Sequence, residues 1–466
     1  MNNIDIYQNI DQLCCIVNIN NTRYKAYLSY KLGCINVLSI EYVGELGNIA
    51  KNIECHVIST NEIFIIDDII EIKSEIGFKS VKFRNLIKVD YYFEQKDFSD
   101  IKFKKINFTF DKINEFLAGI SILKSKKNKN SYTITQKNCR GRKNNLQLSL
   151  PNNFILSFCQ KQTQDKIEAS TSNITINLNK WIELESEKEI TLSEFLIYID
   201  KLILFFSIGL KQRVIINKMW SNKEFNTSST LLTIYPSQIK PIQNKSIDSR
   251  FDILYCWKSF RNLEQILSNF ILNADNEKFE IFLQLYLRAL DYNMDYIPQL
   301  TFLTLTQGLE SYLNFKKFKS KKNTTAKLDK IVIEINNKYN DKRIESALNN
   351  LKQTSFFTKI QLACKQVKLT KILDFSQKNS DIDTNVLKLI TDIKDFRVYF
   401  THYGTLNKKH FNTSIKDVEF ALKILSEIFI LDLVGINAKD IKMIIANNYS
   451  FLDYREFYFK TFCSKL

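Results

Sequence analysis

The sequence predicts an α+β multidomain protein in which a β-rich N-terminal domain is followed by an all-α C-terminal domain. Two observations carry this prediction. Short apolar runs typical of strands fill the first half of the chain, whereas apolar residues recur at helical spacing after Phe251. The polar stretch 236–249 lies between them and holds two of the four prolines. We therefore expect an N-terminal domain over residues 1–240 and a C-terminal domain over residues 250–466.

The β-rich half is predicted from short runs rich in Ile, Val, Tyr and Phe. Strands are expected at 23–30, 34–43, 53–60, 62–72 and 77–89, with weaker ones at 105–110, 131–136, 146–150, 153–160, 213–219 and 229–235. The basic polar stretches 124–130 and 137–145 are expected to be hairpin tips or loops. One helix is predicted at 191–209, because Thr191 and Glu194 have the spacing of a capping box before an apolar run.

The C-terminal half is predicted to be helical throughout. Helices are expected at 251–273, 276–293, 298–318, 325–350, 384–403 and 414–434, with a short one at 437–447. The signals are sharpest for the helix 414–434. Ser414 is its predicted N-cap, Asp417 completes an S-x-x-D box, and Gly435 marks the end.

The net charge of the chain is +16, which favours a polyanionic partner, either nucleic acid or an anionic membrane surface. A Lys- and Asn-rich composition imposed by an AT-rich genome explains the same charge equally well. The most apolar stretch, 196–210, is short and contains Asp200 and Lys201, so we expect no membrane-spanning helix. The first residues also lack a basic region followed by an apolar run, and we expect a cytoplasmic protein.

Cysteine and histidine are distributed in a way that predicts no metal site. The nine cysteines are scattered without a C-x-x-C pair, and the chain has three histidines in total. A zinc site needs four convergent ligands, so we expect reduced, buried thiols, no metal and no cofactor.

Each of the three histidines can be weighed by its surroundings. His56 lies in a predicted strand and is expected to be structural, and His410 follows two lysines in a predicted loop. His402 stands at the end of an otherwise apolar helix, five residues after Arg397. Five helical steps turn the two Cα vectors apart by roughly 140°, although a long Arg side chain can still reach the cleft that His402 faces.

The residue types of Arg397 and His402 suit the cleavage of RNA without a metal ion. A neutral imidazole can accept the proton of a ribose 2′-hydroxyl, and a guanidinium can bind the phosphate as charge builds on it. The product would carry a 2′,3′-cyclic phosphate. Spacing alone leaves open a structural alternative in which Arg397 pairs with an acid and His402 caps the helix.

Three segments together resemble one protein family. Arg397 and His402 match the R-x(4–6)-H signature of HEPN ribonucleases, and nearly the whole chain resembles the ApeA family of bacterial anti-phage proteins. Residues 181–185 (WIELE), followed by the helix from Thr191, resemble the latter part of the N-terminal domain of that family. Residues 302–313 (FLTLTQGLESYL) resemble the first helix of its HEPN core.

The resemblance implies a metal-independent endoribonuclease of the R-x4-H type that acts in abortive infection. Its substrate is expected to be RNA, with tRNA as the implied target. It also implies a homodimer formed through the HEPN domain, with Arg397 and His402 of both chains lining one cleft. The N-terminal domain would sense a phage-derived trigger or restrain the nuclease.

Further residues are candidates for supporting roles. Glu310 and Asp395 are candidates for orienting Arg397 or His402, with a solvated helix face as the alternative, and Tyr403 follows the catalytic histidine. A basic tract after the helix that carries Glu310 either contacts RNA phosphates or forms a flexible charged loop; its lysines are Lys316, Lys317, Lys319, Lys321 and Lys322.

Val398 departs from the family pattern, which usually has a polar residue, commonly Asn, directly after the arginine. Such a neighbour can orient the phosphate or the catalytic groups, so the absence of a polar side chain at this position bears on the rate of turnover more than on the fold. It motivates a rival hypothesis in which the HEPN domain is catalytically inactive and serves as a dimerisation or RNA-binding module.

Overall fold

The fold is taken from a computed structural model. The structure describes residues 9–19, 22–31, 36–42, 53–60, 62–75, 78–89, 101–117, 121–128, 131–138, 146–163, 177–225, 228–235, 253–256, 259–260, 262–291, 297–317, 355–373, 382–401 and 414–446. The chain forms two compact units, one of residues 1–206 with 213–244 and the other of residues 207–212 with 245–466. The predicted boundary stretch, 236–249, lies outside the described residues.

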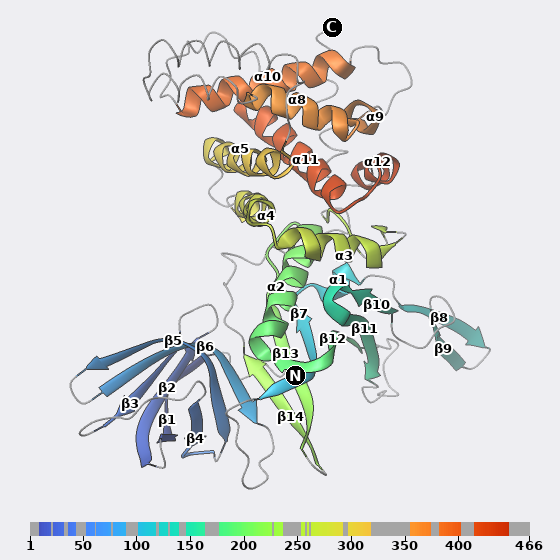
Figure 1. Ribbon diagram of the computed structural model, residues 1–466. Coiled ribbons are helices and arrows are strands. Elements are labelled where there is room, and N and C mark those ends of the chain that lie inside the picture. Colours follow the sequence, from blue (N-terminus) through green and yellow to red (C-terminus); the bar gives the residue numbers. More distant parts are fainter. Residues whose placement is uncertain are drawn as a thin grey trace. The chain divides into compact units, whose positions relative to one another are not determined.

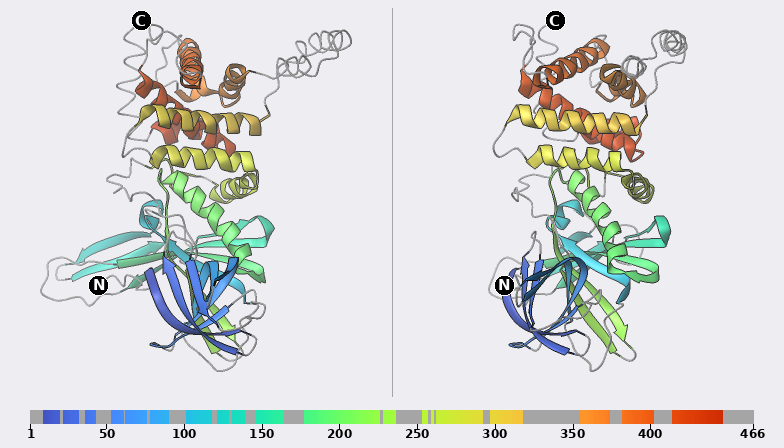
Figure 2. Two further views of the ribbon diagram at one scale, coloured as in Figure 1. Left: turned by 90° about the vertical axis from the view of Figure 1, so that its left-hand side faces the viewer. Right: turned by 60° about the vertical axis from the view of Figure 1, so that its left-hand side comes forward.

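A closed β-barrel forms the first part of the N-terminal unit. Its strands are β1 (Asn9–Ile19), β2 (Thr22–Lys31), β3 (Asn36–Glu41), β4 (Ile53–Val57), β5 (Ile63–Glu75) and β6 (Phe78–Val89). They pair antiparallel in the order β6-β3-β2-β1-β4-β5, and β5 pairs again with β6. The strands drawn in blue in Figure 2 show this closure. Alternate side chains such as Leu28, Leu38 and Val81 fill the interior, which is the outcome that period-two patterning predicts.

Strand β6 also leads into a second, open sheet. One edge of β6 pairs with β3 over residues 78–83 and then with β14 over residues 86–89, while β5 occupies its other edge. The remaining strands of the open sheet are β14 (Ser228–Tyr235), β13 (Ile216–Phe225), β7 (Lys102–Phe110), β12 (Asn177–Thr191), β11 (Phe154–Thr163) and β10 (Leu146–Leu150). The short 3-10 helix Pro151–Asn153 joins the last two, and β8 (Ser121–Asn128) and β9 (Ser131–Asn138) form a separate hairpin.

Helix α2 (Leu192–Gly209) packs on one face of the open sheet. Phe206 of this helix stacks on Phe110 of β7 at 4.8 Å between ring centroids, and Phe195 meets Phe154 of β11 at 5.6 Å. The short helix α1 (Ile113–Phe116) packs its Phe116 against Phe206. These contacts make one face of the sheet an aromatic core, and the other face carries polar residues and two tryptophans.

The predicted capping box of α2 is confirmed. The Thr191 backbone N–H donates to Glu194 Oε2 at 2.8 Å, and the Glu194 N–H donates to Thr191 Oγ1 at 3.4 Å. The hydrogen bonds that the Thr191 backbone N–H and hydroxyl donate to the ionised carboxylate lower the pKa of Glu194.

The C-terminal unit is helical, so the predicted fold class of a β-rich part followed by an all-α part is confirmed (Figure 1). Its helices are α3 (Leu263–Ala274), α4 (Glu277–Asp291), α5 (Pro298–Phe315), α8 (Phe356–Gln366), α9 (Leu369–Leu373), α10 (Ile382–Thr401), α11 (Ile415–Leu433) and α12 (Ala438–Ala446). Helix α5 contacts α4, α8, α10 and α11. Within the described residues, no helix has the length and apolarity needed to cross a membrane.

Aromatic side chains and one buried polar cluster hold the helices together. Tyr312 of α5 stacks on Phe429 of α11 at 4.5 Å between ring centroids. Nearby, Glu427 of α11 is 3% exposed, accepts a hydrogen bond from the Tyr286 hydroxyl at 2.8 Å and lies 3.0 Å from Lys211 Nζ. We call these three residues the Glu427 cluster; an ion pair this deeply buried is costly to break from one side.

Several local predictions were wrong or incomplete. Residues 124–128, expected to be a hairpin tip or loop, belong to strand β8, and the helix expected from residue 251 begins at Leu263. Strands β1 and β12 and helices α8 and α9 were not predicted. The expected helix 325–350 lies outside the described residues.

The helix 414–434 matches its prediction closely. Ser414 Oγ accepts from the Asp417 N–H at 3.2 Å, and the helix ends before Gly435, whose φ of +90° is a conformation that favours glycine.

Candidate functional site

Arg397 lies in the last turns of α10 and is held beside α5 by aromatic packing. Phe396 and Phe400 of α10 both contact Phe302 of α5, each at 6.0 Å between ring centroids. Ile393, one helical turn before Arg397, is fully buried. The apolar face of α10 therefore fixes its rotation, so that Arg397 stands at the edge of the interface with α5 rather than inside it.

Two further helices supply contacts to the guanidinium of Arg397. Its Nη2 forms an ion pair with Glu310 Oε1 of α5, and its Cζ lies 4.7 Å from the centroid of the Phe356 ring of α8. The side chains of Arg397 and Glu310 keep 33% and 35% exposure, respectively. A guanidinium has five N–H donors in a fixed plane, so it can hold a carboxylate on one edge and stack on a ring while the other edge remains available to a phosphate.

The other predicted residues of α10 are placed differently. Asp395 is half-buried, and its carboxylate makes no hydrogen bond or ion pair with the residues that the structure describes. Val398 is half-buried, and the Thr401 hydroxyl donates to the Arg397 carbonyl at 2.8 Å in the last turn of the helix. His402 and Tyr403 lie outside the described residues, directly after the end of α10. The structure thus brings together Arg397 and Glu310 and leaves the position of the histidine open.

The basic tract after α5 is described only at its start. Lys316 caps the C-terminal end of α5, and its Nζ lies 3.3 Å from Asp432 Oδ2 of α11. Lys317 is exposed and adopts a positive φ of 50°. Lys319, Lys321 and Lys322 lie outside the described residues. The ion pair of Lys316 gives this lysine a structural role in joining α5 to α11.

His56 and the buried thiols of Cys159 and Cys364 add no second catalytic centre to the described part of the chain. His56 Nε2 lies 2.6 Å from Glu54 Oε1 on the barrel strand β4, and His410 lies outside the described residues. Burial raises the pKa of the Cys159 and Cys364 thiols to about 12, which keeps both protonated and unreactive near neutral pH. Within the residues that the structure covers, no three His, Cys, Asp or Glu side chains come together as metal ligands.

Sequence reasoning missed Phe356 as a contact of Arg397. Helix α8 is short, and the only clear signal for it is Ser355, whose side chain accepts from the Thr358 N–H as an N-cap. Recognition of that cap would have predicted a helix here, but not its position under the guanidinium.

Comparison with known families identifies both parts of the chain. The ApeA N-terminal domain 1 family matches residues 21–270, more than half of the 466 residues, and the Apea-like HEPN family matches residues 303–440. The second match covers most of α5, including Glu310, and all of α10 with Arg397. Searches of curated proteins and of solved structures return no match. The chain belongs to the ApeA family and carries an Apea-like HEPN domain after its N-terminal domain.

Proposed function

We propose that the protein is a metal-independent endoribonuclease whose reaction is carried by Arg397 and His402. The observation that supports this most is the placement of Arg397. Its guanidinium is partly exposed, is oriented by Glu310 and Phe356, and stands in a domain of the Apea-like HEPN family. His402 follows one residue after α10, close in sequence to this guanidinium.

In the proposed reaction, the neutral imidazole of His402 accepts the proton of a ribose 2′-hydroxyl. The 2′-oxygen then attacks the adjacent phosphorus, and the bond from phosphorus to the 5′-oxygen of the next nucleotide breaks. The departing oxygen takes up a proton, which leaves a 5′-hydroxyl and a 2′,3′-cyclic phosphate. Arg397 binds the non-bridging oxygens while negative charge builds on them.

Glu310 has a positioning role in this scheme. By pairing with one edge of the guanidinium, its carboxylate fixes the direction in which the other edge points. Phe356 restricts the same plane from a third helix. We give Asp395 no part in holding Arg397, because the two lie two residues apart on one helix and side chains at that spacing do not face each other.

The biological role that fits this chemistry is anti-phage defence by abortive infection. We propose that the substrate is RNA, with tRNA as the target, and that the enzyme works in the cytoplasm as a homodimer formed through the HEPN domain. The N-terminal domain would respond to a phage-derived trigger. Lys317 and the lysines at 319, 321 and 322 are candidate phosphate contacts.

The second candidate function is a catalytically inactive HEPN module that binds RNA or dimerises. Val398 motivates it, because the residue after the arginine carries no polar group that could help to orient a phosphate. In that case Arg397 would bind RNA without turning it over.

Incubation of the purified full-length protein with total tRNA in EDTA tests the proposal. We expect cleavage that yields 2′,3′-cyclic phosphate ends, and loss of that cleavage in Arg397→Ala and His402→Ala. Binding without products would support the inactive module. Strict dependence on Mg²⁺, or products with 3′-hydroxyl ends, would refute the proposed chemistry.

A further inference from the structure

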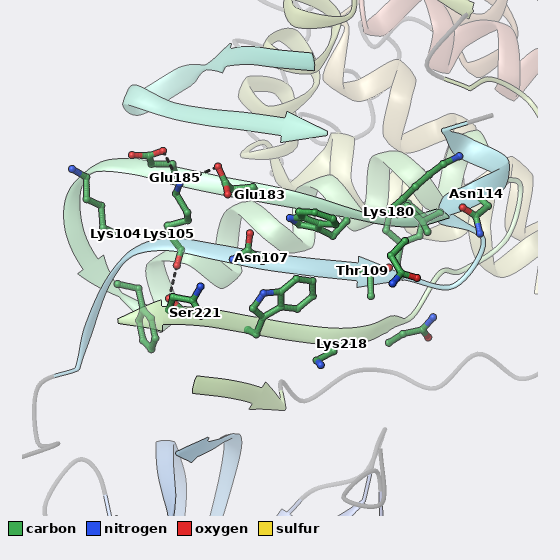
Figure 3. A pocket seen from close by; sticks show the side chains of 18 of the residues that line it. Lys104, Lys105, Asn107, Thr109, Asn114, Lys180, Glu183, Glu185, Lys218 and Ser221 are labelled. Carbon is green, nitrogen blue, oxygen red and sulfur yellow. Dashed lines mark hydrogen bonds and ion pairs between the residues drawn. The ribbon is translucent and has the colours of Figure 1, made fainter. Parts of the chain in front are cut away.

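The face of the open sheet opposite α2 is hollowed into a groove lined by polar and aromatic side chains. Ile182 of β12, Phe108 of β7 and Met219 of β13 pair across the sheet and are buried. Because side chains alternate along a strand, the residues next to them point to the other face. Figure 3 shows this set on β12, β7 and β13, with the helix behind the sheet. The groove has a volume of about 1320 Å³.

Two tryptophans stand together in this groove. Trp181 of β12 and Trp220 of β13 are half-buried, and their ring centroids lie 6.5 Å apart with the planes at 51°. Asn107 of β7 is the cross-strand partner of Trp220 and lies between the two outer strands. Tryptophans are usually placed where their rings are covered, so two partly exposed rings in one concave surface mark a binding surface for a planar or apolar group.

The charge of the groove is positive. Six lysines and three glutamates line it, which gives a net charge of +3. Lys105 lies 3.0 Å from Glu183 and 3.4 Å from Glu185, so this lysine and the two carboxylates form one internal network. Lys104 is exposed at one end, and Lys218 Nζ lies 5.7 Å from the centroid of the Trp220 ring.

We propose that this groove binds single-stranded nucleic acid, with bases stacked on Trp181 and Trp220 and phosphates held by the surrounding lysines. Every base has a flat face that can stack on an indole, and interleaved cations follow the backbone. Two rings 6.5 Å apart on one face of a sheet suit successive unpaired bases, whereas the bases of a duplex are stacked on one another and are not available. The amide of Asn107, which lies on the strand between those of the two tryptophans, can hydrogen-bond a base edge.

An acidic peptide is the competing ligand for a basic groove. It would use the lysines but would gain little from two tilted indole rings, because carboxylates are repelled by the negative face of an aromatic ring. The position of the tryptophans is therefore what favours nucleic acid over an acidic protein.

The test uses the full-length chain and a fluorescein-labelled oligouridylate with 2′-O-methyl riboses. This probe has no 2′-hydroxyl to attack phosphorus, so its binding does not depend on the proposed nuclease activity. We expect fluorescence anisotropy to report binding and the intrinsic tryptophan emission to be quenched. Trp181→Ala and Trp220→Ala should each weaken binding about tenfold, and Trp181→Phe and Trp220→Phe should retain most of it.

A lysine variant keeps the test informative if the tryptophan variants fold poorly. Lys104→Ala should lower the slope of log Kd against log salt by about 0.7, because one phosphate contact is lost. Lys79→Ala on barrel strand β6 is the matched control and should leave the slope unchanged. Equal affinities in the wild type and in the folded double variant Trp181→Ala/Trp220→Ala would overturn the proposal. Displacement of the probe by polyglutamate at equal charge would overturn it as well, in favour of an acidic protein partner.

Discussion

Replacement of Glu310 by glutamine tests whether this carboxylate positions Arg397 or merely lies on a solvated helix face. Glutamine keeps the length and one acceptor oxygen but removes the charge that pairs with the guanidinium. The two side chains are 33% and 35% exposed, so solvent screens the pair and its contribution to stability is about 0.2–1 kcal/mol. The free energy of unfolding from urea titration should therefore fall by no more than about 1 kcal/mol.

The effect on cleavage should be larger than the effect on stability. A hydrogen bond to a charged group is worth about 1.5–3 kcal/mol, so its loss from the oriented guanidinium should lower kcat by roughly 10- to 100-fold. KM for RNA should stay level or fall, because the variant removes a negative charge that repels phosphate beside Arg397. Single-turnover cleavage of tRNA at increasing enzyme concentrations separates the two parameters.

Glu280→Gln on the exposed face of α4 is the control for the loss of one negative charge in the same unit. It should leave kcat unchanged. If Glu310→Gln cleaves as fast as the wild type at unchanged stability, the positioning role is refuted and the solvated-face interpretation is correct. If both variants slow cleavage equally, the effect comes from net charge and not from the contact with Arg397.

The other predictions concern stability, the residue after the arginine and assembly. Glu427→Gln leaves the buried ammonium of the Glu427 cluster unpaired and should lower the free energy of unfolding by about 3–5 kcal/mol in urea; a loss below 1 kcal/mol would show that the cluster is hydrated. Burial and the nearby carboxylate raise the pKa of Tyr286 above its ordinary value of 10. The contribution of Tyr286 to the free energy of unfolding should therefore be constant below pH 10 and decline above it, because the phenol ionises more readily in the unfolded chain. Thermal melts that show no decline at alkaline pH would contradict this. Val398→Asn should raise the rate of cleavage by the equivalent of roughly 1 kcal/mol, whereas a lower rate at equal stability would show that valine is needed for packing. Mixed dimers of Arg397→Ala and His402→Ala chains should cleave RNA while each parent is inactive, and inactive mixed dimers of confirmed composition would refute a shared cleft.

Regular patterns in the sequence predicted those helices and strands whose signals lie within the element itself. The helix from Ile415 was predicted because Ser414, Asp417 and Gly435 are local signals that need no tertiary partner. Barrel strands such as β2 were predicted for the same kind of reason, since one buried face imposes alternation.

The missed strands lack such regularity for identifiable reasons. In β1 the pairing shifts between Ile10 and Leu13, with Gln12 at a positive φ of 50°, so the bulge interrupts the alternation that sequence reading relies on. Strand β12 alternates Ile182 and Leu184 with glutamates, and those charges belong to a polar face that only the tertiary pairing with β7 reveals.

The candidate site shows the same division between local and long-range information. The spacing of Arg397 and His402 suggested a catalytic pair, but the spacing could not distinguish a catalytic arginine from one that pairs with an acid. Arg397 does pair with an acid, Glu310. This ion pair would support a purely structural role only if it engaged all the N–H donors of the guanidinium. A third of the side chain is exposed, and one edge of a planar group with five donors is enough for a carboxylate. The ion pair and the stacking on Phe356 therefore restrict the direction of the remaining donors without occupying them, which is the pre-organisation that phosphate binding in a transition state requires.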